Sequence, residues 1–203
     1  MKPTKWIIFD VSGVLTHWTF RNPKGYEING KHFDGKKIEL LYESLEYKEY
    51  MTGRISYRKF LEAFFGNQNL DMTVGEFSAI FENDLRPIKG IHELIKKLSS
   101  NYKIALASNE GKELAEIRIK KSGVERYVSK KIISYQIGKL KPEKDFFIKT
   151  LEILGAKPYE CLFIDDSPLN VEAAIAVGIK SLVFTDTSKL KQDLEKIDFQ
   201  IMI

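Results

Sequence analysis

Three aspartates of this chain come directly after short apolar runs, and their positions suggest a shared chemistry. Asp10 follows the run 6–9, and the pair Asp165 and Asp166 follows the run 161–164. Close carboxylates repel one another, so a cluster of them is costly unless a cation lies among them. Carboxylate oxygens without histidine or thiolate neighbours form a hard site that suits Mg²⁺. The sequence therefore predicts a magnesium site, provided that the strands bring these aspartates together.

Two further stretches could hold an anion beside such a cation. Ser108 and Asn109 follow a predicted strand at 102–107, where a hydroxyl and backbone N–H groups can bind an anion at a helix N-terminus. Lys141, before a proline, adds a positive charge on the same side. A cation, an anion cradle, a lysine and a carboxylate nucleophile at Asp10 together describe phosphoryl transfer through an aspartyl-phosphate. Each feature alone also fits a plainer role, such as an exposed lysine or a helix cap.

The elements that must position these residues alternate between strands and helices. After the first strand at 6–9, the pattern from Pro87 onward predicts strands at 102–107, 131–135, 161–164 and 181–184, separated by helices. Such alternation indicates right-handed βαβ units and a parallel sheet. Ligands of open α/β sheets bind beyond the carboxyl ends of the strands, which is where the candidate residues stand. We therefore expect a doubly wound, Rossmann-like α/β core made of residues 1–15 and 86–203.

Between the first strand and this alternating region, the chain has a different pattern. Residues 17–35 suggest a loop or a small hairpin, and helical periodicity then predicts helices at 36–51, at 56–66 and from Thr73. Thr73 followed by Glu76 is a capping box. No strand is expected among these helices, so residues 16–85 are predicted to form a small helical cap over the edge of the sheet.

Composition limits the class of protein. The chain has 203 residues, 43% of them hydrophobic and 30% charged, with a mild net charge of +4. We expect no nucleic-acid partner from this charge, and no membrane partner because no apolar stretch approaches the ~18 residues of a membrane span. The first residues lack the apolar region of a signal peptide, and the lone Cys161 suits a reducing compartment. These features predict a cytoplasmic protein and leave its oligomeric state open.

In their order and spacing, four stretches of the chain resemble the motifs of the haloacid dehalogenase superfamily, most of whose members are Mg²⁺-dependent phosphatases. The stretches are 9–15, 105–109, 138–142 and 162–170. The helices after the first stretch lie where that family places a C1 cap. The segment 53–56, with Phe60, is similar to the small caps of the sugar-phosphate phosphatase and soluble epoxide hydrolase amino-terminal branch.

The resemblance implies a role for each matching position. Asp10 would attack phosphorus, and Mg²⁺ would be held by Asp10, the carbonyl of Ser12 and Asp166, with Asp165 bound directly or through water. Ser108, the backbone of Asn109 and Lys141 would hold the phosphoryl oxygens. The implied catalytic residues are Asp10, Ser108 and Lys141, the substrate-binding residues Ser12, Ser108, Asn109 and Lys141, and the metal ligands Asp10, Ser12, Asp165 and Asp166.

At one position the chain departs from that pattern. Phosphatases of the family usually carry a second aspartate two residues after the nucleophile as general acid and base, and this chain has Ser12. A serine hydroxyl is a poor acid and base near neutral pH, so turnover is slow unless water or the substrate supplies the proton. The leading hypothesis is a phosphatase of a small phosphorylated metabolite. The alternatives are a catalytically weak metal- and phosphate-binding protein, and a dehalogenase or phosphonatase. The Asp165–Asp166 pair argues against a dehalogenase, which needs no metal.

Overall fold

A parallel sheet forms the centre of the computed structural model, which describes residues 4–197. Its five strands lie in the order β5-β4-β1-β6-β7, and each neighbouring pair is parallel. The strands are β1 (Trp6–Phe9), β4 (Lys103–Ser108), β5 (Val128–Ile133), β6 (Cys161–Asp165) and β7 (Lys180–Val183). The predicted α/β class with a Rossmann-like parallel sheet is confirmed.

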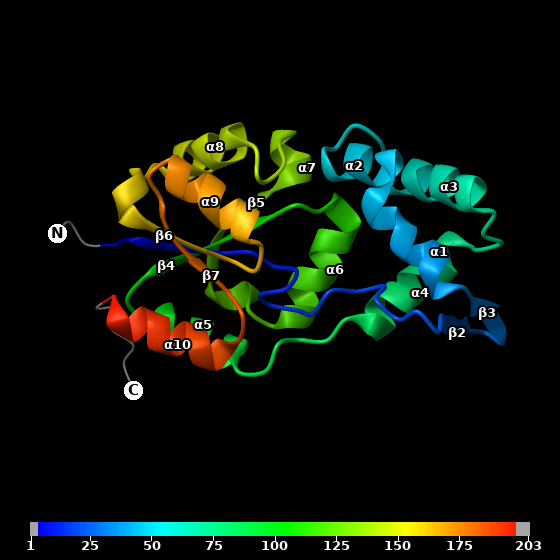
Figure 1. The fold of residues 1–203 in the computed structure, drawn as a ribbon, viewed down its shortest axis with the longest axis horizontal. Helices are drawn as coiled ribbons and strands as arrows, with labels where there is room; N and C mark the ends of the chain where they lie inside the picture. The colour runs from blue at the N-terminus through cyan, green and yellow to red at the C-terminus, as the bar shows by residue number, and fades with distance from the viewer. Residues whose placement is uncertain (1–3, 198–203) are drawn as a thin grey trace.

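Helices cover both faces of this sheet (Figure 1). Alternate residues of β1 enter different cores: Ile7 and Phe9 pack with one set of helices, and Trp6 and Ile8 with the other. This explains why the run is apolar throughout. The helices of the first face are α5 (Ile91–Leu98), α6 (Lys112–Ser122) and α10 (Thr187–Lys196), and those of the second are α8 (Lys144–Leu154) and α9 (Pro168–Ala176).

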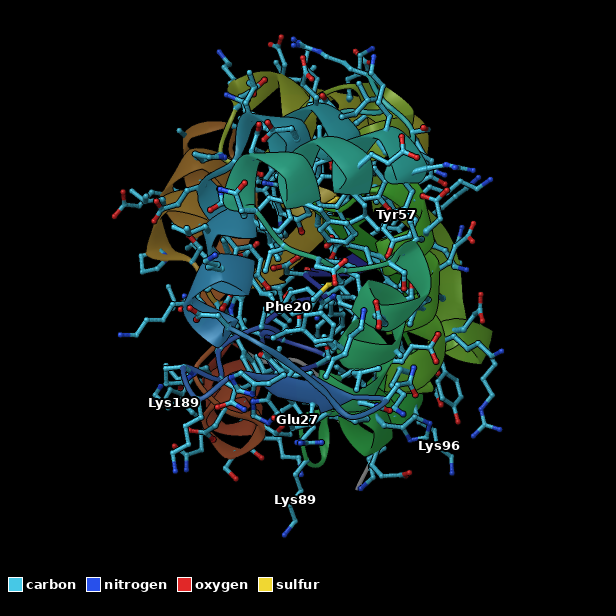
Figure 2. All side chains as sticks on the ribbon, turned by 90° about the vertical axis from the view of Figure 1, so that its right-hand side faces the viewer. Phe20, Glu27, Tyr57, Lys89, Lys96 and Lys189 are labelled. Atoms are coloured by element: carbon cyan, nitrogen blue, oxygen red, sulfur yellow. The ribbon has the colours of Figure 1, made fainter. Side chains whose placement is uncertain are left out.

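A second, mainly helical unit lies at one end of the sheet, on the right of Figure 1. It has its own aromatic core, in which the ring of Phe20 lies 4.8 Å from Phe77 and 5.7 Å from Phe81 between centroids. Figure 2 looks onto this unit and shows Phe20 in its middle. The unit contains a hairpin of β2 (Tyr26–Ile28) and β3 (Lys31–Phe33), then α1 (Gly35–Glu39), a 3-10 turn (Leu40–Glu43), α2 (Leu45–Met51), α3 (Tyr57–Gln68) and α4 (Val74–Asp84).

The helix expected over 36–51 is divided, which corrects the prediction. Ser44 has an extended backbone with ψ of 144°, and its hydroxyl accepts a hydrogen bond from the Tyr47 amide. Serine is favoured at such an N-cap because its side chain satisfies an amide that the helix leaves free. A new helix, α2, therefore begins at Leu45 instead of continuing the first one.

Other bounds also differ from the sequence prediction. The helix predicted at 56–66 continues through Gly66 to Gln68. The strand expected at 131–135 lies at Val128–Ile133, because Ser134 begins the short helix α7 (Ser134–Ile137). The helix expected to open at Lys141 begins at Lys144, so Lys141 lies in the preceding loop. No helix within residues 4–197 has both the length and the apolar composition needed to cross a membrane.

The helical unit contacts the sheet domain through α6. The hydroxyl of Tyr50 accepts hydrogen bonds from the amides of Glu113 (3.0 Å) and Leu114 (3.2 Å), at the start of α6. A Cβ atom on Gly111 would lie 2.1 Å from the Tyr50 ring, so the close approach requires glycine there. The tyrosine thus supplies the cap that α6 lacks from its own N-cap residue.

Candidate active site

Neighbouring strand ends bring the candidate residues together at one edge of the sheet. Asp10 directly follows β1, Ser108 ends β4 and Asp165 ends β6, and these strands are adjacent in the sheet. The ammonium nitrogen of Lys141 lies 2.7 Å from Oδ1 of Asp10 and 2.6 Å from Oδ2 of Asp165. One buried cation therefore joins two buried carboxylates.

The two adjacent aspartates have different surroundings. Asp165 is fully buried, and besides Lys141 it accepts hydrogen bonds from the Ser167 amide (2.9 Å) and from the side-chain amide of Asn170 (3.0 and 3.1 Å). Both of its oxygens are thus engaged. Asp166 is partly exposed and lines the pocket described below, and its Oδ2 accepts a hydrogen bond of 2.9 Å from the Trp18 indole. Asp166 is therefore the better placed of the two to bind a ligand directly.

Gly13 allows the turn after β1 to pass close to Asp166. Its φ is +83°, a conformation that favours glycine, and a Cβ atom there would lie only 2.0 Å from Oδ2 of Asp166. Any other residue would displace this carboxylate. Glycine is therefore required here both by the positive φ and by the close approach of the Asp166 side chain.

Burial and charge shift the pKa values of the cluster. Burial raises the pKa of Asp10 to about 7, an effect that Lys141 opposes and Asp165 reinforces. Burial and the Asp165 charge also raise the pKa of Asp166. Burial alone would lower the pKa of Lys141, but the carboxylates of Asp10 and Asp165 outweigh it and raise this pKa. One lysine therefore does not offset the effect of burial and of the neighbouring carboxylates on the pKa values of Asp10 and Asp166.

The cluster has the donor set of a hard divalent cation. Carboxylate oxygens of Asp10, Asp165 and Asp166 lie within 4.8 Å of one another. The buried hydroxyl of Ser12 has no hydrogen-bond partner in the described part of the chain, so a polar group beside Asp10 is left unsatisfied. A cation with its bound water would both neutralise the carboxylates and offer that hydroxyl a partner.

Asn109 fixes the loop that carries Lys141. Its side-chain amide donates to the Lys141 carbonyl and accepts from the Lys141 amide, each at 2.8 Å. Because its side chain is occupied in this way, Asn109 has only its backbone to offer an anion. Ser108 is buried beside it in the same pocket.

A pocket of about 200 Å³ opens between the sheet edge and the helical unit. It brings together every site residue predicted from the sequence except Asp165, which lies behind it. The lining residues are Asp10, Ser12, Trp18, Tyr42, Tyr47, Ser108, Asn109, Glu110, Arg118, Lys141, Asp166, Ser167 and Asn170.

A buried ion pair forms the wall of the pocket that faces the helical unit. Glu110 and Arg118 are 2% and 1% exposed, and Oε2 of the glutamate accepts from Nε of the arginine at 3.1 Å. The other glutamate oxygen accepts from the Tyr47 hydroxyl at 2.7 Å. Arg118 also donates to the hydroxyl of Thr16 (3.1 Å) and to that of Thr19 (3.3 Å). The pair thus joins α6 to α2 and to the segment that leaves β1.

Sequence reasoning missed this wall. The sequence pattern places Trp18 in the stretch 17–35 and Tyr42 and Tyr47 in the predicted helix 36–51, and it gives none of the three a role in the site. One signal could have found the pair: Arg118 stands four residues after the apolar Leu114, on the same face of a helix. A charge on a buried helix face requires a partner.

Comparison with known protein families agrees with this geometry. Residues 4–178 match the haloacid dehalogenase-like hydrolases. The chain belongs to this family. The predicted membership is confirmed.

Relatives within the family carry several activities. The chain is 30% identical over 119 residues to flavin mononucleotide hydrolase 1 of Arabidopsis thaliana, a match that covers 57% of this chain and about half (47%) of that protein. It is 24% identical over 178 residues to the phosphorylated carbohydrates phosphatase of Thermotoga maritima, covering 87% of this chain and 82% of that one. A magnesium complex of a family enzyme from Bacteroides thetaiotaomicron has the same fold, with a TM-score of 0.78, 22% identity and coverage of 94% and 100%.

Proposed function

We propose that the protein is a Mg²⁺-dependent phosphatase of small phosphorylated metabolites, acting through an aspartyl-phosphate at Asp10. The observation that carries the proposal is the buried Asp10 carboxylate, held 2.7 Å from the Lys141 ammonium beside two further carboxylates. The names of the relatives support it, since they include a phosphatase and a magnesium complex.

The chain's own groups fit the proposed magnesium ion. Asp10, Asp166 and the Ser12 carbonyl would hold it directly, and Asp165 through water, because the oxygens of Asp165 already accept from Lys141, Ser167 and Asn170. When bound, the ion supplies positive charge that stabilises both the ionised aspartates and a phosphoryl group.

Each remaining residue has a role in the proposed reaction. A carboxylate oxygen of Asp10 bonds to phosphorus while the bond to the leaving alcohol oxygen breaks, and water then hydrolyses the acyl phosphate. Ser108, the Asn109 backbone and Lys141 would hold the phosphoryl oxygens. Lys141 also favours the ionised, nucleophilic form of Asp10, because its ammonium opposes the rise in the Asp10 pKa that burial causes.

The helical unit of residues 16–85 would act as the cap of a core made of 1–15 and 86–203. Trp18, Tyr42 and Tyr47 from this unit line the same pocket as Asp10. A cap in that position excludes water from the reacting groups and provides the surface that meets the leaving group.

A screen of phosphorylated metabolites for release of inorganic phosphate, with and without Mg²⁺, tests the proposed function. We expect release from at least one monoester, lost on chelation and restored by added Mg²⁺. Binding of Mg²⁺ and phosphate without turnover on any ester would contradict the proposal and favour a binding protein instead.

Replacing Asp166 by alanine is expected to abolish most Mg²⁺ binding. The substitution removes one of the carboxylates that line the pocket and leaves Asp10 with a ligand set too small for the ion. Isothermal titration calorimetry of the native protein and the variant measures the difference. The matched control is Asp71→Ala, which removes a fully solvent-exposed aspartate of the helical unit and should leave binding unchanged. Equal Mg²⁺ affinity in Asp166→Ala and native protein would exclude the site.

Ser12→Asp is expected to speed the cleavage of alkyl phosphates more than that of aryl phosphates. An alkoxide leaving group needs a proton, whereas a phenolate is already a weak base, and acid–base assistance typically contributes about 10²–10⁴-fold. The buried Ser12 hydroxyl, which has no partner in the described residues, marks the place for the new carboxyl group. The two rates for each protein measure this effect. No gain on either ester, with normal Mg²⁺ binding, would show that the missing aspartate does not limit turnover.

A further inference from the structure

The wall of the pocket that faces the helical unit combines the Glu110–Arg118 ion pair with the aromatic rings of Trp18, Tyr42 and Tyr47. Among the described residues that line the pocket, the only cations are Lys141, which belongs to the phosphoryl site, and Arg118. The Arg118 guanidinium is neutralised by Glu110 at 3.1 Å and is 1% exposed. The Arg21 guanidinium, which lies over the rings of Trp18 and Tyr42, is paired with Glu39. Both arginines on this side of the pocket therefore already have a counter-ion within the described residues.

The other polar groups of this wall are also occupied. The Tyr47 hydroxyl donates to Glu110 at 2.7 Å, and the Tyr42 hydroxyl donates to the Thr19 carbonyl at 2.9 Å. The Trp18 indole donates to Asp166, and its ring meets that of Tyr42 edge to face, 5.5 Å between centroids. A leaving group would therefore meet aromatic rings rather than a free charge.

We infer that the site selects phosphate monoesters of compact, uncharged alcohols and rejects esters whose leaving group carries a carboxylate or a second phosphate. This inference rests on the proposed phosphatase function and specifies its substrate class. A negative leaving group would lose its hydration without gaining an unpaired cation, and would approach the Glu110 carboxylate. An uncharged sugar, polyol or single ring avoids the much larger cost of desolvating a charge, and aromatic faces pack well against it.

The size of the pocket also limits the size of the leaving group. Its volume of about 200 Å³ is below the range of roughly 300–1,000 Å³ typical of sites for drug-sized ligands, and the phosphoryl group must occupy part of it. Bulky esters such as nucleotides and flavin nucleotides exceed this space. The leaving group that fits is a short polyol or a single ring.

Two three-carbon esters separate charge from size. Glycerol 3-phosphate and 3-phosphoglycerate differ chiefly by the carboxylate of the second, so the ratio of their kcat/KM values measures the discrimination. For the native protein we expect a ratio of at least 10 in favour of glycerol 3-phosphate. Equal values, or a preference for 3-phosphoglycerate, would overturn the inference without any variant being needed. Lack of phosphate release from every monoester would instead contradict the proposed phosphatase function.

Glu110→Gln tests the physical cause of this discrimination. The amide has nearly the same shape as the carboxylate but leaves the Arg118 charge without a counter-ion at the wall, so the ratio should fall at least 10-fold toward the anionic ester. The matched control is the double variant Glu110→Gln with Arg118→Gln, in which the wall is again neutral and the ratio should return toward the native value. An unchanged ratio in folded Glu110→Gln would show that the pair does not determine the selectivity.

Discussion

Asp10→Asn is expected to lower phosphate release by about 10⁴-fold or more, as substitution of an enzyme nucleophile commonly does. The amide matches the carboxylate in size, but its oxygen is a far poorer nucleophile. Asp10 stands at the end of the central strand β1, and no other carboxylate of the cluster combines its contact to Lys141 with a place in the pocket lining. Initial rates on the best ester found in the screen, at saturating Mg²⁺, measure the loss.

A thermal melt must accompany this measurement, because Asp10 is buried and its loss could act through the fold. The asparagine removes one of three repelling carboxyl groups, so we expect the melting temperature of the metal-free variant to equal or exceed that of the native protein. Native-like rates in a well-folded Asp10→Asn variant would contradict aspartyl-phosphate chemistry in this protein.

The second large effect concerns stability: Arg118→Met should lower the free energy of unfolding by about 3–5 kcal/mol. Removing one partner of a buried ion pair leaves the other charge buried without compensation, which is the costly case. Here Glu110 is 2% exposed, and within residues 4–197 its carboxylate would keep only the Tyr47 hydroxyl as a hydrogen-bond partner. The hydrogen bonds from Arg118 to Thr16 and Thr19 would be lost as well. Urea unfolding followed by circular dichroism measures the change.

The control for this prediction is an exposed pair of the same type. Arg58 and Glu62 form an ion pair on α3 with side chains 82% and 58% exposed, so Arg58→Met should leave the urea midpoint essentially unchanged. If Arg118→Met shifted the midpoint no more than Arg58→Met does, the buried pair would not be a main link between α6 and the helical unit.

The strand ends were predictable because the signals that mark them are local. An apolar run followed by aspartate is enough to place Asp10 and Asp165 at the carboxyl ends of buried strands. Parallel pairing then brings the ends of β1, β4 and β6 together whatever the details of the loops. For this reason the sheet and the polar end of the pocket follow from sequence patterns alone.

The wall formed by the Glu110–Arg118 pair and the neighbouring aromatic rings was not predictable in this way, because its contacts join distant parts of the chain. Tyr47 and Glu110 are 63 residues apart, and Thr16 and Arg118 are 102 residues apart. Nothing near Tyr47 in the sequence distinguishes a tyrosine that faces the pocket from one that fills the core. The division of the first long helix at Ser44 is a similar case, since serine is compatible with either structure and its capping bond decides between them.

The hydrogen bond between Trp18 and Asp166 has a practical consequence for following the site in solution. The sequence contains two tryptophans, and the other, Trp6, is buried in β1 among the side chains packed against α8 and α9. Trp18 is 43% exposed and touches the carboxylate proposed to bind the ion, so a change of charge at Asp166 alters the electric field at its indole. Its fluorescence emission therefore provides an intrinsic optical signal of occupancy, suited to stopped-flow mixing without an attached dye.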